Sequence, residues 1–149
     1  MNTATNQDHP IIQAFLESGG APTPMSGPLA ESLKGRILQL DREAGLAVLA
    51  FDPDERFLQG AGVIQGGIVT AMLDYAMALA AFSRLPPGKT FGTVSLNSHF
   101  LKPCLPGPHL ASGRLERMGG RMIFAGAQLM REGSDSLVAT ATSVMAISG

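Results

Sequence analysis

One stretch of this chain, Gly60–Arg84, is almost free of charged residues: before its last residue it contains one, Asp74. After the Gly66-Gly67 pair the residues are nearly all apolar, so no helical phase presents a polar face. The pattern predicts a helix that is buried on almost every side. The apolar run Ile68–Phe82 is shorter than the about 20 residues needed to cross a bilayer and has an acid at its middle, so we interpret it as a core helix.

Asp74 is the residue of this helix that most needs an explanation. A carboxylate in such surroundings loses hydration, and proteins rarely bury an unpaired acid without a use for it. We therefore take Asp74 as the candidate reactive group. The alternative is a structural acid that is hydrogen-bonded to its neighbours.

The Gly66-Gly67 pair is the candidate oxyanion partner. Missing side chains let a ligand carbonyl approach the backbone, where the free N–H groups of the first helical turn point at it. The positive end of the helix favours a developing oxyanion, by about 3 kcal/mol in comparable sites. The alternative is a tight turn that serves helix packing.

Composition bounds the remaining possibilities. The 149 residues, 45% hydrophobic and 15% charged, fit one globular domain, and a net charge of −1 without a basic run argues against binding nucleic acid or anionic membranes. The single cysteine, Cys104, cannot form an internal disulfide, and no secretory signal is apparent, so we expect a cytoplasmic protein with Cys104 as a packing residue. The three histidines form no metal-spaced pair and no phosphate-binding glycine loop occurs, so we predict neither metal nor cofactor.

The remaining elements follow from hydrophobic periodicity and turn residues. We expect residues 1–7 to be frayed. Asp8 and Pro10 indicate the start of a helix that ends at Gly19-Gly20 and packs one face on the body of the protein. The proline-rich residues 19–31 indicate a loop. Strands are expected over 32–41, 46–51, 91–103, 109–118, 121–132 and 137–147, with one helical turn around 55–58. On the strand 91–103, one face would carry Val94, Leu96 and Phe100, and the other Thr93, Ser95, Asn97 and His99.

These elements define an α+β fold in which an antiparallel sheet of about six strands wraps around one long helix. We divide the chain into an N-terminal helix and loop, 1–32, and a main body, 33–149, within one domain. One sheet and one helix leave a sheet edge uncovered, so we expect a symmetric homodimer that joins the two sheets, and a dimer of dimers.

At this point the chain resembles the hotdog-fold thioesterases, in particular those of the phenylacetate-degradation (PaaI) type. That pattern has a His-Gly-Gly turn that opens the central helix, an acid nine residues after the His, and a strand of the form T-V-x-L-N-x-x-F-L-x-P. Here Gln65-Gly66-Gly67 is the turn, Asp74 follows Gln65 by nine, and the strand begins at Thr93 and ends at Pro103. The Gly120-Arg121 pair and the closing LVATATSVMAI also match, so the resemblance covers residues 33–147. The departure is Gln65, whose amide can donate and accept but cannot carry a proton near neutral pH.

The resemblance implies an acyl-CoA thioesterase that releases a free acid and CoA. Asp74 would act as general base on a water or attack the thioester carbon, with Gly67 and Gly66 as oxyanion donors and a neighbouring chain completing the site. Gln65 would fix the turn, and Gln59 falls where the family often places a residue that orients the carbonyl or water. Thr93 and Ser95 could position the attacking water, unless Thr93 is simply a half-buried strand residue.

Three cations are candidates for the coenzyme A phosphates: Arg117, Arg121 and Lys102. The default interpretation is that they are solvated charges at strand ends. The other functional hypotheses are a non-catalytic acyl-CoA binding or sensing protein, suggested by Gln65, and a dehydratase, which wants a His near the helix start. A pure interaction module would give no reason for the buried acid.

Overall fold

The structure, a computed structural model, describes residues 8–149; the expected fraying of residues 1–7 lies outside this range. The helices are α1 (Asp8–Glu17), α2 (Pro28–Ser32) and α3 (Gly66–Arg84), with a 3-10 turn, η1 (Glu55–Phe57), before α3. The strands are β1 (Thr23–Pro24), β2 (Arg36–Asp41), β3 (Leu46–Phe51), β4 (Thr90–Phe100), β5 (His109–Met118), β6 (Met122–Arg131) and β7 (Leu137–Ser148).

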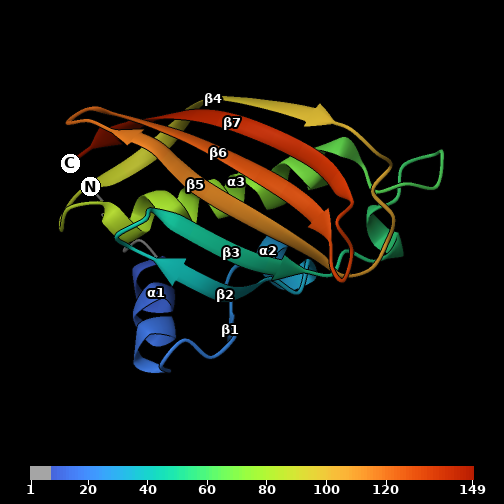
Figure 1. The fold of residues 1–149 in the computed structure, drawn as a ribbon, viewed down its shortest axis with the longest axis horizontal. Helices are drawn as coiled ribbons and strands as arrows, with labels where there is room; N and C mark the ends of the chain where they lie inside the picture. The colour runs from blue at the N-terminus through green and yellow to red at the C-terminus, as the bar shows by residue number, and fades with distance from the viewer. Residues whose placement is uncertain (1–7) are drawn as a thin grey trace.

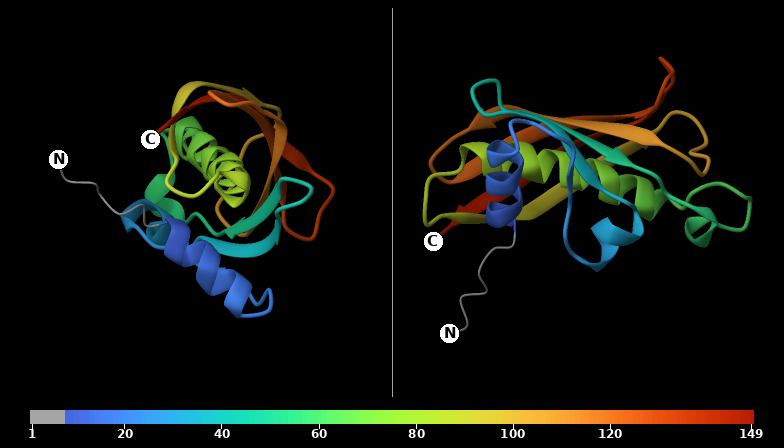
Figure 2. Two further views of the ribbon diagram at one scale, coloured as in Figure 1. Left: turned by 90° about the vertical axis from the view of Figure 1, so that its left-hand side faces the viewer. Right: turned by 90° about the horizontal axis from the view of Figure 1, so that it is seen from below.

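The strands form one antiparallel sheet in the order β1-β2-β3-β5-β6-β7-β4. The sheet curls around α3, which runs lengthwise through its concave side (Figures 1 and 2). The α+β class and the sheet wrapped around one long helix are therefore confirmed. Of the described helices, α3 has the length and composition of a membrane span, yet more than half of it is buried inside the protein, as expected of a core helix.

The sheet approaches α3 closely because a row of small residues crosses it beneath the helix. Ala47, Gly113, Ala127 and Ala141 are paired one after another across β3, β5, β6 and β7. At Gly113 an added Cβ would lie 2.1 Å from the carbonyl oxygen of Ala76 in α3. Glycine is therefore required at this position by the contact between strand and helix backbone.

Strand β4 carries a β-bulge that changes which side chains face α3. Its pairing with β7 shifts between Thr93 and Ser95, so Val94 is an extra residue and is 63% exposed. A bulge reverses the alternation of side chains on either side of it. Thr93, before the bulge, and Ser98, after it, both face the helix. The expected grouping of Thr93 with Asn97 on one face and of Val94 with Leu96 on the other is wrong for this reason.

The N-terminal segment is more structured than the sequence pattern predicts. The expected loop over 19–31 is wrong in part, because β1 pairs with β2 and Pro28 begins the short helix α2. Proline is compatible with both an edge strand and a first helical turn, so its frequency here does not exclude either element. The docking face of α1 is confirmed, since Ile11, Ile12 and Phe15 are buried in the core shared with α3.

The close contact at Gly113 leads to a stability prediction. Gly113→Ala places a methyl group against the backbone of α3, and we expect it to lower the free energy of unfolding by about 3 kcal/mol, measured by urea denaturation. Gly120→Ala is the control, because nothing lies within 4 Å of a Cβ added there. Equal stabilities of the two variants would contradict the account of the helix contact.

Candidate active site

Asp74 lies near the middle of α3, half-buried, on the side that faces β4. The hydroxyl Oγ1 of Thr93 donates a long hydrogen bond of 3.5 Å to Oδ1 of Asp74. Burial raises the pKa of the carboxyl above its ordinary value, and the Thr93 hydroxyl lowers it in part. The structure thus places Thr93 beside Asp74, as expected of a residue that would position the attacking water.

Asp74 belongs to a stripe of α3 that the sheet leaves partly uncovered. After the first turn, the residues of α3 that keep solvent exposure are Thr70, Ala71, Asp74, Tyr75, Ala78 and Arg84. Their spacing of three and four residues places most of them on one side of the helix. A ligand or a second protein chain can therefore reach Asp74 along this stripe.

The glycine pair forms the first turn of α3 after its N-cap, Gln65. The N–H groups of Ile68 and Val69 both donate to the carbonyl of Gln65, at 2.9 and 3.2 Å. No hydrogen bond among the described residues takes up the N–H of Gly66 or Gly67. A Cβ added at Gly66 would lie 3.2 Å from the Phe100 ring, whereas nothing lies within 4 Å of one added at Gly67. The N–H of Gly67 is therefore open to a ligand at the positive end of the helix, and its role as an oxyanion donor stays a prediction.

Gly67 and Asp74 of one chain are too far apart to act on one carbonyl. Asp74 follows Gly67 by seven residues, which at about 1.5 Å per residue separates them by about 10 Å along the helix. A general base must approach within about 3 Å of the proton that it removes. If Gly67 and Asp74 act on the same carbonyl, one of the two must come from a second chain.

The loop before α3 holds the two predicted glutamines in different ways. Oε1 of Gln59 accepts from the N–H of Ala61 at 2.5 Å, so this amide oxygen is used to close the loop. Gln65 is exposed, and its side chain makes no capping hydrogen bond. The Gln65 amide is thus available to a ligand, and the role of Gln59 stays a prediction.

Two hydroxyls of the site were missed by the sequence analysis. Oγ1 of Thr70 and Oγ of Ser98 lie 2.9 Å apart and join α3 to β4 one helical turn before Asp74. Ser98 faces inward only because of the bulge at Val94, which no local sequence pattern reveals.

The three predicted coenzyme A cations are exposed but do not lie together in one chain. Nζ of Lys102 donates to Oγ of Ser136 at 3.0 Å, in the turn between β6 and β7. Arg121 lies in the turn at the opposite end of β6, and Arg117 precedes that turn on β5. Lys102 is thus near the glycine end of α3, and the two arginines are near the Thr93 end.

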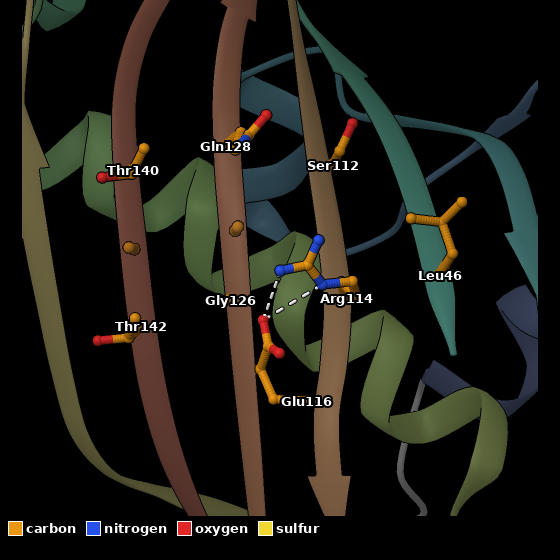
Figure 3. Close-up of a pocket in the computed structure, with 10 residues that line it drawn as sticks. Leu46, Ser112, Arg114, Glu116, Gly126, Gln128, Thr140 and Thr142 are labelled. Carbon is orange, nitrogen blue, oxygen red and sulfur yellow. Dashed lines mark hydrogen bonds and ion pairs between the residues drawn. The ribbon is translucent and has the colours of Figure 1, made fainter. Parts of the chain in front are cut away.

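The outer face of the sheet carries a depression of about 240 Å³ that does not include Asp74. In this depression, Nη2 of Arg114 donates a hydrogen bond of 2.6 Å to Oε1 of Glu116. The other polar side chains that line it are Ser112, Gln128, Thr140 and Thr142. Figure 3 shows these side chains in front of the strands and α3 behind them. This polar depression and the stripe of α3 are therefore on opposite sides of the sheet.

An antiparallel sheet curled around one long helix, with an acid on that helix and a glycine turn at its start, defines a hotdog fold of the thioesterase type. The thioesterase superfamily profile matches residues 61–138. A Pseudomonas aeruginosa protein that carries a provisional esterase name is 33% identical over 131 residues, 87% of this chain and 95% of the relative. The chain therefore belongs to the thioesterase superfamily, and the predicted class of enzyme, a thioester hydrolase, is confirmed.

Solved structures agree with this assignment. A protein of Ralstonia eutropha JMP134, described as phenylacetic acid degradation-related and provisionally as a thioesterase, has a TM-score of 0.78 at 33% identity, over 89% of this chain and 97% of that chain. The Escherichia coli PaaI protein from the phenylacetic acid degradation operon has a TM-score of 0.77 at 19% identity, over 99% of this chain and 97% of that chain. The PaaI-like hotdog fold is thus confirmed.

The raised pKa of Asp74 predicts how its replacement changes stability with pH. The folded state retains the Asp74 proton to a higher pH than the unfolded state does. The contribution of protonated Asp74 to the free energy of unfolding is therefore fully present below the pKa of the unfolded state, and it is lost as pH rises through the pKa of the folded state. We expect Asp74→Asn to have a Tm a few degrees higher than the wild type at pH 8, with the difference shrinking toward pH 4. Differential scanning calorimetry across this range checks it, with exposed Asp135→Asn as the control. A lower Tm for Asp74→Asn at pH 8 would contradict the desolvation of this carboxyl.

Proposed function

We propose that this protein is an acyl-CoA thioesterase that hydrolyses an acyl- or aryl-acyl-CoA to the free acid and CoA. The observation that carries the proposal is the Asp74 carboxyl, whose pKa is raised by burial and which receives one long hydrogen bond, on the open stripe of α3. A carboxylate with these properties is a stronger base than a solvated one. The buried Cys104 thiol is compatible with action in the reducing cytoplasm.

Asp74 acts in one of two ways. As a general base, it takes a proton from a water that attacks the thioester carbonyl, and Thr93 holds that water beside the carboxylate. As a nucleophile, it attacks the carbonyl itself and forms an anhydride that water then hydrolyses. In both cases the carbonyl oxygen becomes negative, and the N–H of Gly67 stabilises it at the helix N-terminus.

A homodimer formed by pairing of two β4 strands would complete the site. β4 is a sheet edge of eleven residues and exposes Val94 and Phe100, at 63% and 56%. An unpaired edge of this kind is suited to antiparallel pairing with a second copy. Because α3 runs beside β4 with Gly66 near Phe100 and Asp74 near Thr93, such pairing brings the Gly67 end of one helix toward Asp74 of the other.

The same pairing supports the proposed coenzyme A contacts. Lys102 follows the Phe100 end of β4, whereas Arg117 and Arg121 are at the Thr93 end of the sheet. A symmetric antiparallel pair of β4 strands brings the Lys102 end of one subunit toward the arginine end of the other. Exposed cations from two subunits would then bind the phosphates at the rim of the site. Two such dimers would associate in the proposed dimer of dimers.

A second candidate is a protein that binds acyl-CoA without hydrolysing it. The observation that favours it is Gln65, an exposed amide that cannot exchange a proton near neutral pH. Tight thioester binding without turnover over a broad range of acyl groups would support this candidate instead.

The proposed chemistry predicts the outcome of a thioester hydrolysis panel. Wild type should hydrolyse one or more acyl- or aryl-acyl-CoA substrates, and Asp74→Ala and Asp74→Asn should lose at least about a hundredfold in kcat, because both lack the base or nucleophile. Release of free CoA thiol measures the reaction, and circular dichroism shows that the variants are folded.

Gln65→His is the matched variant for the turn. It should retain or raise activity, since a histidine at this position keeps hydrogen-bonding groups at the helix start. Full activity of Asp74→Ala would eliminate the proposed mechanism, and no turnover by wild type or by Gln65→His would favour the binding protein.

A further inference from the structure

A buried cysteine and a buried histidine are in contact beneath the loop that begins α3. Sγ of Cys104 lies 3.5 Å from Nε2 of His109, and Nδ1 of His109 lies 2.8 Å from the carbonyl oxygen of Gly107. The two residues are 4% and 1% exposed. The proposed hydrolysis uses neither of them.

The partners of the ring determine where the protons lie. The carbonyl of Gly107 can only accept, so Nδ1 of His109 carries its proton and Nε2 is an acceptor. The Cys104 thiol then donates its proton to Nε2. Burial raises the pKa of Cys104 to about 11 and lowers the pKa of His109, so both groups are neutral near pH 7, as this pattern requires.

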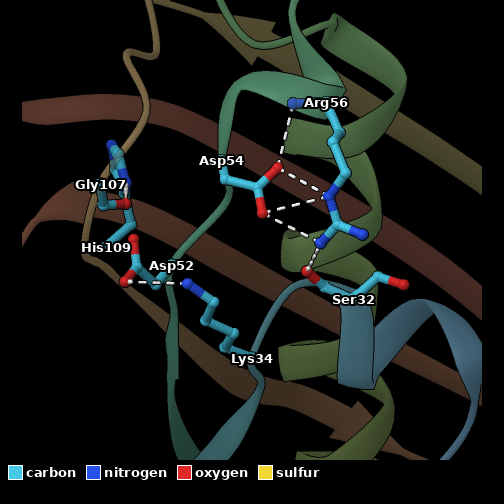
Figure 4. Close-up of polar contacts among 7 residues, drawn as sticks. All are labelled: Ser32, Lys34, Asp52, Asp54, Arg56, Gly107 and His109. Carbon is cyan, nitrogen blue, oxygen red and sulfur yellow. Dashed lines mark hydrogen bonds and ion pairs between the residues drawn. The ribbon is translucent and has the colours of Figure 1, made fainter.

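This pair is connected to the glycine turn by one backbone hydrogen bond. The N–H of Ile64 donates to the carbonyl of Cys104 at 2.7 Å, and Ile64 immediately precedes Gln65. The two contacts of His109 also join the ends of the turn that runs from Cys104 to His109. Within this turn, the N–H of Gly107 donates to the carbonyl of Pro53 at 3.0 Å. Figure 4 shows His109 and Gly107 beside the loop that carries Asp52, Asp54 and Arg56.

Arg131 of β6 supports the same turn from its other side. Nη1 of Arg131 donates to the carbonyl of Pro106 at 2.8 Å. Gly107 has a φ of 119°, a backbone conformation that favours glycine, and a Cβ added there would lie 2.6 Å from this guanidinium and displace it. These contacts accompany the arrangement in which the Cys104 carbonyl accepts from the N–H of Ile64.

We propose that Cys104 and His109 are positioning residues that hold the Gly66-Gly67 turn in place through the carbonyl of Cys104. The inference rests on the proposed function, because the turn matters only if Gly67 stabilises an oxyanion. A displacement of about 1 Å at such a donor costs much of its catalytic contribution. Loss of the Cys104–His109 contact should therefore lower kcat more than it raises KM, because the Gly67 N–H stabilises the transition state more than it stabilises bound substrate.

The charged groups that act on the His109 ring are Arg131, which lowers its pKa, and Asp52, which raises it less than burial lowers it. The pKa of His109 is lower in the folded state than in the unfolded state. Neutral His109 therefore contributes stability that is fully present above the pKa of the unfolded state and is lost as pH falls through the pKa of the folded state. Protonation places a second donor against the thiol, and sulfur is a weak acceptor.

Three variants of the full-length protein test the proposal. Cys104→Ala removes the donor to Nε2, Cys104→Ser keeps a hydroxyl donor, and Ile12→Ala removes buried volume at the far side of the core as a stability control. We expect Cys104→Ala to lower kcat on the order of tenfold with little change in KM, and Cys104→Ser to restore most of it. Ile12→Ala should lower Tm while leaving kcat unchanged.

Amide hydrogen exchange supplies a readout that does not depend on activity. The Ile64 N–H should exchange slowly in wild type and in Cys104→Ser, and faster in Cys104→Ala. If wild type hydrolyses no thioester, the proposed function fails, and the exchange data alone decide whether the pair holds the turn. Unchanged Ile64 exchange in Cys104→Ala, or an unchanged kcat with a lower Tm, would overturn the positioning role. If Cys104→Ala does not fold, His109→Gln is measured in its place, with the same expected losses and the same contradicting outcomes.

Discussion

The contact between α3 and the inner face of the sheet is the constraint on which the rest of the structure depends. Small residues cross four strands beneath the helix, and Gly113 touches the backbone at Ala76. This close approach buries the helix, and burial in turn raises the pKa of Asp74. The same placement sets the helix N-terminus beside Phe100. One packing interaction therefore positions both Asp74 and the turn that holds the proposed oxyanion donor.

The helix that positions these two groups also keeps them apart. Gly67 and Asp74 are about 10 Å from one another along α3, too far for one carbonyl. The free edge of β4 and the partly uncovered stripe of α3 lie on the same side, where Thr93 contacts Asp74 and Ser98 contacts Thr70. The bulge at Val94 allows both strand residues to face the helix, although they are five positions apart. A second copy would thus meet a surface that already carries half of each site.

The predictable part of the fold was local in sequence. The run without a polar face indicated α3, and strand segments bounded by turn residues indicated β3 and β5. A lone acid after a glycine pair indicated the candidate site, which stays a prediction. The inward turn of Thr93 depends on the pairing of β4 with β7, and the Cys104–His109 contact depends on a turn stabilised by Arg131. Such features arise from tertiary structure, so no periodicity or spacing reveals them.

The central claim, a site shared between two subunits, is tested most directly by mixing two inactive variants. Gly67→Pro removes the N–H of the proposed donor in a first helical turn, where proline is tolerated, and Asp74→Asn removes the base. Refolding the two together in equal amounts should restore about a quarter of wild-type activity, because half of the dimers are mixed and each has one intact site of two. A mixture that stays inactive, although tagged subunits show that mixed dimers have formed, would contradict the account.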